Sequence, residues 1–220
     1  MATLLALETS GDACSVALWR DGDVVERHEV TPRSHTQAVL PLVDAILSEA
    51  NMSLPSLNAI AFGCGPGSFT GLRVCASVVQ GLAFAADLPC LPVSSLAALA
   101  HTAITQHQIG EGQRILVCVD ARMDEVYWCA YRVVDGFPQA LGNEQLSSPE
   151  AVLLEGDFHR VGSGWQYAER LPVFAEGADI HLLPRATSVA ALGAQLWLAD
   201  GAVPSDRALP RYLRDEVAWR

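Results

Sequence analysis

Hydrophobic positions in the first 108 residues predict three strands, followed by helices that alternate with further strands. Apolar or alternating runs at 3–7, 14–19 and 24–30 read as strands, and Asp21-Gly22 is a strong hairpin signal between the second and third. Apolar side chains at helical spacing predict a helix over 36–50. The pattern then predicts a strand at 57–62, a helix at 74–86, a short extended segment at 89–93 and a helix from 94 or 95 to about 106.

The same pattern begins again after residue 112. A strand at 114–119 ends at Asp120, an alternating strand follows at 125–134, and Asp135-Gly136 predicts a second hairpin into a strand around 140–146. A small helix at 149–154, a strand at 160–161 and a helix at 188–199 complete the prediction.

This repetition indicates two lobes built from one ancestral unit. The order of elements in the first lobe predicts an α/β protein with a two-lobed actin-like (ribonuclease-H-like, ASKHA) fold, in which each lobe has a mixed sheet with a three-strand meander. We expect a first lobe at 1–108, joined by the C-terminal tail at 204–220, and a reduced second lobe at 109–203.

Composition narrows the class of protein. The chain has 220 residues, of which 50% are hydrophobic and 18% charged, so it is globular rather than disordered. The formal net charge of -11 argues against direct binding of nucleic acid, which needs Lys and Arg to neutralise phosphates. The six cysteines form no CxxC pair and sit mostly in apolar runs, which favours buried free thiols in a reducing compartment.

The apolar segments show neither the pattern of a signal peptide nor that of a membrane span. The N-terminus has no basic region and Glu8 interrupts its apolar run, so we expect no signal peptide. Asp87 and Pro89 end the longest apolar segment, so we expect no membrane span and a cytoplasmic location.

A glycine-rich stretch, GPGSFTGLR at 65–73, connects the strand at 57–62 to the helix at 74–86. Ser68 or Thr70 could cap that helix, and free amides at its start could form a small anion site. No Lys-Ser or Lys-Thr follows the glycines, which excludes a Walker loop, and the third glycine of a dinucleotide fingerprint is missing. We therefore interpret the loop as the elbow that sets where the helix begins.

The helix at 74–86 is apolar on nearly all sides. Such a helix is buried on more than one side, either by another chain, or between the lobes, or under the tail. Small residues at Ala76, Ser77 and Gly81 would let a partner helix approach closely.

Candidate chemistry is sparse elsewhere. The six histidines show no metal-ligand spacing, and we expect His101 and His107 to be solvated helix residues. If the lobes resemble those of actin-like ATPases, the turn after the first strand of each meander would face a nucleotide. The corresponding vestigial cleft would consist of Glu8, Thr9, Ser10, Asp120, Arg122, Gly162 and Gly164. The first acid is Glu rather than Asp, and the second turn lacks glycine.

The chain resembles the TsaB (YeaZ) family over essentially its whole length. The resemblance rests on LALETS at 5–10, Ser34-His35, DAR at 120–122, EVY at 125–127, PRYLR at 210–214 and, most specifically, the loop. The family-loop residues are Gly65, Pro66, Gly67, Ser68, Phe69, Thr70, Gly71 and Arg73.

The resemblance implies a role in forming threonylcarbamoyladenosine beside the tRNA anticodon in bacteria. TsaB is there the partner of the catalytic paralogue TsaD, with the ATPase TsaE joining the complex and TsaC supplying threonylcarbamoyl-adenylate. TsaD carries a His-x-x-x-His metal motif, and Ser95 and Leu99 stand at those positions here. Because leucine cannot ligate a metal, we expect no catalytic residue, no metal and no required cofactor, with weak ATP or ADP binding only in the complex.

The resemblance also implies how the chain assembles. We expect a heterodimer with TsaD, a homodimer when the chain is alone, indirect contact with tRNA and no contact with membranes. The expected partner interface comprises Val39, Val43, Ile46, Leu47, Val74, Cys75, Val78, Val79 and Leu82. Two alternatives stay open: an autonomous actin-like ATPase, and a peptidase that acts on its paralogue.

Overall fold

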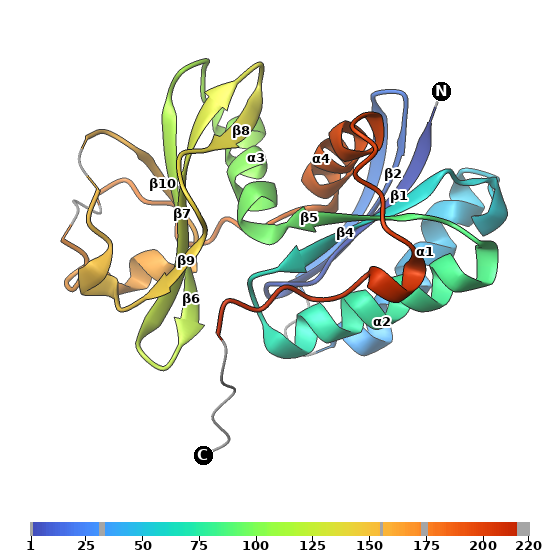
Figure 1. Ribbon diagram of the computed structural model, residues 1–220, viewed down its shortest axis with the longest axis horizontal. Coiled ribbons are helices and arrows are strands. Elements are labelled where there is room, and N and C mark those ends of the chain that lie inside the picture. The colour runs from blue at the N-terminus through green and yellow to red at the C-terminus, as the bar shows by residue number, and fades with distance from the viewer. Residues whose placement is uncertain (1, 31–33, 155, 173–175, 215–220) are drawn as a thin grey trace. The chain divides into compact units, whose positions relative to one another are not determined.

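The computed structural model describes residues 2–30, 34–154, 156–172 and 176–214 (Figure 1). The chain divides into two compact units, which are described separately below. Unit 1 consists of Met1–Ala98 with Leu183–Pro210, and unit 2 of Leu99–Leu182 with Arg211–Arg220. The chain therefore passes between the units three times, after residues 98, 182 and 210.

Unit 1 is built on a mixed sheet with the strand order β3-β2-β1-β4-β5. The meander is antiparallel, and β4 and β5 continue it in parallel, as expected for strands joined by crossover helices. The strands are β1 (Thr3–Glu8), β2 (Ala13–Arg20), β3 (Asp23–Val30), β4 (Ala59–Gly65) and β5 (Cys90–Ser94).

Helices cover both faces of this sheet (Figure 1). Alternate strand residues such as Leu5 and Phe62 pack with the helices α1 (His35–Glu49) and α2 (Phe69–Ala86). The intervening residues, such as Leu4 and Ala61, pack with α4 (Ala186–Leu198). Two short 3-10 turns, η1 (Leu54–Ser56) and η4 (Ser205–Arg207), complete unit 1.

The position of α4 corrects the predicted lobe boundaries. We expected the helix at 188–199 in the second lobe, but α4 packs on the first sheet, because both faces of that sheet are apolar and each needs a helical layer. The approach is close: a Cβ on Gly193 would lie 2.6 Å from Cβ of Ala61. The tail at 204–210 belongs to unit 1 as predicted, whereas Arg211 and the described residues after it belong to unit 2.

Unit 2 holds a second sheet with the order β10-β6-β7-β8, and β9 also pairs with β7. Its strands are β6 (Arg114–Arg122), β7 (Glu125–Val134), β8 (Phe137–Ala140), β9 (Gln145–Ser147) and β10 (His159–Val161). The single strand predicted around 140–146 is wrong, since β8 and β9 are separate. The remaining elements are α3 (Ser95–His107), which enters unit 2 at Leu99, and the 3-10 turns η2 (Pro149–Ala151) and η3 (Ser163–Tyr167).

The two units repeat one arrangement, which confirms the predicted actin-like fold. In unit 1 the meander β1-β2-β3 is antiparallel and β4 lies parallel to β1; in unit 2 β6-β7-β8 is antiparallel and β10 lies parallel to β6. Both predicted hairpins are also confirmed. The φ angles are 49° at Asp21 and 104° at Gly22, and 51° at Asp135 and 77° at Gly136. A type I′ turn requires positive φ at both of its central residues.

All six cysteines are free and buried, as predicted. The expectation that no segment could span a membrane is corrected, because α2 is long and apolar enough by length and composition alone. In this structure one side of α2 packs on the sheet of unit 1.

Candidate functional site

In unit 1 the turn after β1 is bound directly to the glycine loop after β4. The Ser68 amide donates to the Ser10 carbonyl at 2.8 Å, and the Thr9 hydroxyl donates to the Gly71 carbonyl at 2.8 Å. Thr9 is fully buried. The sequence motif at 5–10 and the family loop therefore form one structural site, although about 60 residues of chain separate them.

Glycines are required where these two segments touch. A Cβ on Gly71 would lie 2.0 Å from the Thr9 carbonyl oxygen, and a Cβ on Gly67 would lie 2.7 Å from Cβ of Ser10. A Cβ on Gly63 would lie 2.0 Å from a carboxylate oxygen of Glu8. Gly67 and Gly71 thus let the loop approach the backbone of the turn, and Gly63 leaves room for the Glu8 carboxylate, which larger residues would prevent.

The loop amides that could have bound an anion instead donate hydrogen bonds within the protein. The Gly65 amide donates to the Ser95 hydroxyl at 3.2 Å, and the Gly71 amide donates to the Ser68 hydroxyl at 3.3 Å. Ser68 is thus the helix cap, one of the two residues predicted for that role. With the Ser68 amide also engaged, the loop serves as a packed elbow more than as a phosphate cradle.

Glu8 is turned into the protein instead of toward an open cleft. Its side chain is 1% exposed, one carboxylate oxygen accepts from the Ser10 amide at 2.5 Å, and the other accepts from the Ser95 hydroxyl at 3.0 Å. Burial raises the pKa of this carboxyl, and the hydrogen bonds from Ser10 and Ser95 offset part of that effect. Such a carboxyl is placed for holding the loop, not for binding a solvated metal ion.

In unit 2 the predicted residues Asp120, Arg122, Gly162 and Gly164 come together at the end of β6. The Asp120 carboxylate accepts from the Arg122 amide at 2.8 Å and from the Tyr167 hydroxyl at 3.2 Å. A Cβ on Gly162 or Gly164 would lie 2.5 Å from the Cys118 carbonyl oxygen or sulfur, respectively.

The two units therefore repeat a local motif as well as a fold. In each, an acid lies at or near the end of the first strand, and a glycine turn that follows the neighbouring parallel strand packs against this region. Asp120 also has a cationic neighbour, since Arg122 Nη1 lies 3.1 Å from its second oxygen.

Most of the predicted interface residues lie in the core of unit 1. Val39, Val43, Ile46, Leu47, Cys75 and Val79 are all at most 8% exposed and pack on the sheet. In this packing they cannot contact a partner, so that part of the prediction is corrected. Val74, Val78 and Leu82 are partly buried and pack at the edge of the same core.

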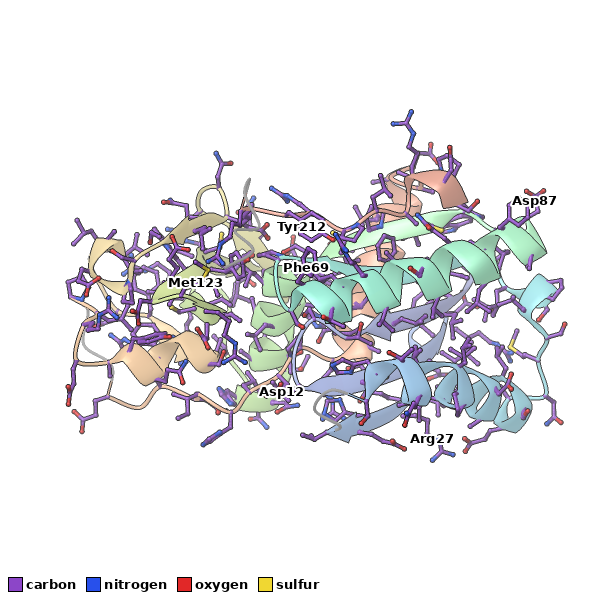
Figure 2. All side chains as sticks on the ribbon, turned by 90° about the horizontal axis from the view of Figure 1, so that it is seen from below. Asp12, Arg27, Phe69, Asp87, Met123 and Tyr212 are labelled. Carbon is purple, nitrogen blue, oxygen red and sulfur yellow. The ribbon has the colours of Figure 1, made fainter. Side chains whose placement is uncertain are left out.

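A different stripe of α2 faces outward. The exposed residues are spaced three or four apart, as one face of a helix requires, and Phe84 among them is 82% exposed. The α2 outer face, as defined here, consists of Thr70, Arg73, Ser77, Gly81, Phe84 and Ala85. Figure 2 labels Phe69 and Asp87 at the two ends of this helix, and the Arg73 guanidinium lies 3.8 Å over the ring of Phe69.

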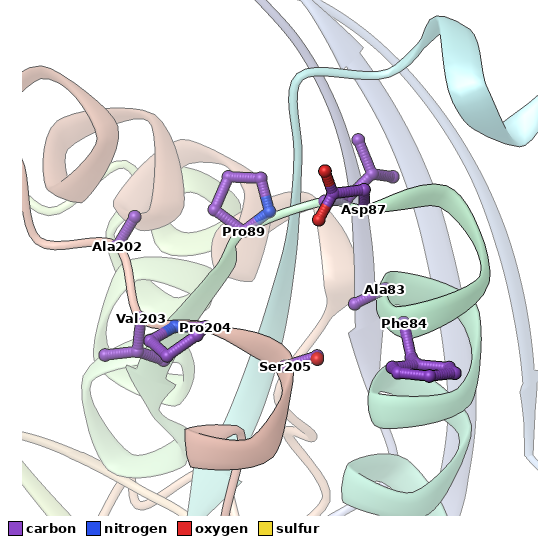
Figure 3. A pocket seen from close by; sticks show the side chains of 9 residues that line it. Ala83, Phe84, Asp87, Pro89, Ala202, Val203, Pro204 and Ser205 are labelled. Carbon is purple, nitrogen blue, oxygen red and sulfur yellow. The ribbon is translucent and has the colours of Figure 1, made fainter.

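The chain's own tail covers one flank of α2. The Gln80 side chain donates to the Ala208 carbonyl at 3.1 Å, and Ala208 is fully buried. Beyond it, a pocket of about 430 Å³ lies between the end of α2, at Ala83 and Phe84, and residues 202–205 (Figure 3). Burial under the tail, one of the readings considered for this helix, therefore applies to one flank but not to the outer face.

The histidines and thiols offer little reactive chemistry. His101 is 9% exposed, and its ring lies tilted against that of Phe137 with the ring centroids 5.3 Å apart, so its prediction as a solvated residue is wrong. Burial lowers its pKa to about 4, and raises the pKa of Cys14 and Cys129 to about 11. Among the residues that the structure describes, no group of three or more His, Cys, Asp or Glu side chains is arranged to hold a metal ion.

The fold and this site define a class of protein. It is a two-lobed actin-like protein in which the turn after β1, with its acid Glu8, is covered by the glycine loop after β4. A family profile described as "TsaD: tRNA N6-adenosine threonylcarbamoyltransferase" matches residues 27–219. The chain belongs to this family and, within it, to the TsaB (YeaZ) group, as the following relatives show.

Two curated relatives are named "tRNA threonylcarbamoyladenosine biosynthesis protein TsaB". The protein from Escherichia coli (strain K12) is 39% identical and the one from Haemophilus influenzae is 40% identical, each over 99% of this chain and 96% of the relative. Among solved structures, YeaZ from Pseudomonas aeruginosa is 44% identical with a TM-score of 0.91, and the match covers 97% of this chain and all of that one.

Proposed function

We propose that this chain is a non-catalytic partner that activates a TsaD protein in forming threonylcarbamoyladenosine on tRNA. The names of the curated relatives support the pathway. The observation that carries the non-catalytic role is the inward-facing Glu8 carboxylate, which is engaged by Ser95, the residue at a position where TsaD is expected to have a metal-ligating histidine.

The α2 outer face supports the partner role. It combines small residues at Ser77, Gly81 and Ala85 with the exposed ring of Phe84. A Cβ on Gly81 would meet no atom within 4 Å, so a second helix could approach the backbone there. Aromatic side chains such as Phe are enriched in protein–protein interfaces.

The outer residues of α1 extend this surface. Leu40 is 49% exposed, and Pro41 and Ala45 are exposed on the same helix. Because α1 and α2 pack on the same face of the sheet, we expect their outer sides to form one surface. TsaD, built on the same fold, would present the equivalent helix pair, and TsaE would join the assembled complex.

The two alternatives receive less support. An autonomous ATPase would need open phosphate-binding turns, whereas the amides at Gly65, Ser68 and Gly71 are bonded within the chain. A thiol peptidase would need an accessible thiolate, but the cysteines are buried and burial raises the pKa of Cys118 to about 12.

Reconstitution tests the activator role. TsaD, TsaE, threonylcarbamoyl-adenylate and tRNA are combined with and without this chain, and the modified nucleoside is quantified. We expect modification to depend on this chain. Full-rate modification by TsaD without it would contradict the proposal.

Substitutions on the α2 outer face test the interface. Gly81→Arg should abolish co-purification with TsaD while the isolated chain stays folded, because the new side chain enters open space. Gln195→Arg on the exposed side of α4 is the matched control and should leave the complex intact. If both variants bind TsaD equally well, α2 is not the contact surface.

A further inference from the structure

The C-terminal segment at 202–214 is anchored in both units. In unit 1 Val203 exchanges two backbone hydrogen bonds with Cys90, each of 2.8 Å, and the Ala208 carbonyl accepts from Gln80 on α2 at 3.1 Å. After Pro210 the chain enters unit 2, so this segment provides the third covalent connection between the units.

Two arginines hold the end of this segment in unit 2. Arg211 Nη1 lies 3.3 Å from the Glu144 carboxylate, whose side chain is 8% exposed. The Arg214 guanidinium donates to the Glu125 carboxylate and to the Ala121 carbonyl at 3.3 Å. Because these acids are partly shielded from solvent, dissolved salt screens the two ion pairs less than it screens fully exposed pairs.

Arg214 binds a turn with an unusual backbone. Its contacts Ala121 and Glu125 flank three successive residues with positive φ: Arg122, the last residue of β6, and Met123 and Asp124 in the turn, at 63°, 56° and 60°. The left-handed region costs non-glycine residues on the order of 1 kcal/mol each, so the turn needs outside contacts to persist. The same turn directly follows Asp120.

We propose that residues 202–214 form a strap that couples α2 in unit 1 to the β6–β7 turn in unit 2. Moving Ala208 away from α2 should weaken the contacts of Arg211 and Arg214, because these residues follow Ala208 closely in the chain. Conversely, breaking the contacts of Arg214 should weaken the packing of Ala208 on α2. Whatever binds beside Gln80 thereby changes the stability of the turn at 121–125. This coupling goes beyond the proposed function and exists in the isolated chain, whether or not TsaD binds.

Hydrogen exchange of the isolated full chain, read by mass spectrometry, tests the coupling. Arg214→Ala should raise the exchange rate at 121–126, and also at 203–208 in unit 1, by about fivefold. Arg132→Ala, which removes an exposed arginine of β7, is the matched control and should change neither segment. Faster exchange confined to 121–126 would overturn the proposal.

Two further variants separate coupling from general loosening. Gln80→Leu removes only the bond to Ala208 in unit 1, yet it should raise exchange at 121–126 in unit 2. The charge swap Arg214→Glu with Glu125→Arg should return both segments part of the way to wild-type rates, because it restores the ion pair but not the hydrogen bond to the Ala121 carbonyl. An unchanged turn in the first variant, or no recovery in the second, would likewise refute the strap.

Discussion

The Ser95 hydroxyl donates a hydrogen bond of 3.0 Å to the carboxylate of Glu8, a residue 87 positions earlier in the chain. Ser95 begins α3 and Glu8 ends β1. Their contact occupies one oxygen of the acid, the Ser10 amide occupies the other, and Gly63 packs against both. An acid that could have faced a ligand is thus used to hold the turn and the loop together.

The buried Glu8 carboxyl should make stability depend on pH. Its pKa is raised in the folded state above the ordinary value of 4.5, so the unfolded chain loses this proton first and stability falls as pH rises from about 4.5 toward the folded pKa. Glu8→Gln removes this dependence. In urea unfolding, the free energy of unfolding of the variant should fall less, or rise more, between pH 5 and pH 7.5 than that of the wild type; equal changes would contradict the shift.

Glu26 should cap α4 from a distant strand. Its carboxylate accepts from Arg185 Nε at 2.8 Å, from the Ser15 hydroxyl at 2.8 Å and from the Thr187 amide at 3.2 Å. Burial raises its pKa, but these hydrogen bonds outweigh burial and hold the pKa below 4.5. The stabilisation is therefore present above about pH 4.5 and is lost as pH falls below it.

Glu26→Ala should lower the free energy of unfolding by about 2 kcal/mol at pH 7, because it leaves Arg185 half-buried without its partner. Chemical denaturation measures this loss. The double variant Glu26→Met with Arg185→Met should recover much of it, whereas an equal or larger loss would show that the pair itself is not responsible.

Two glycines of α2 should respond oppositely to alanine. At Gly81 a Cβ meets nothing within 4 Å, so Gly81→Ala should stabilise the isolated chain by up to about 1 kcal/mol through helix propensity. At Gly71 a Cβ would lie 2.0 Å from the Thr9 carbonyl oxygen, so Gly71→Ala should destabilise by about 2 kcal/mol or more. Thermal unfolding of both variants gives the comparison, and shifts of the same sign would refute it.

His101 should weaken the fold in mild acid. Burial lowers its pKa from 6.5 to about 4, so the unfolded chain binds a proton that the folded chain does not, and stability falls as pH drops from 6.5 toward 4. By pH 4.5 the cost reaches about 2 to 3 kcal/mol. His101→Leu should lose correspondingly less stability between pH 7 and pH 4.5 in denaturant titrations; an identical loss would exclude His101 as the cause.

Local sequence patterns predicted most of the elements, the internal repeat and the family. Alternation and helical spacing report which residues share a face, and Asp-Gly pairs report type I′ hairpins, because these signals act over a few residues. They predicted the first sheet, both hairpins and the burial of the cysteines, and the loop at 65–73 indicated the family.

Which apolar face forms the core, and which acid is held by hydrogen bonds, became visible only in the folded protein. An apolar stripe is required both for packing on a sheet and for binding a partner, so periodicity could not separate buried Val79 from exposed Phe84. Pairs such as Glu8 with Ser95, and Glu26 with Arg185 across 159 residues, depend on strands and helices that meet only after folding. For the same reason the sequence could not assign α4 to the first sheet, since its apolar side fits either one.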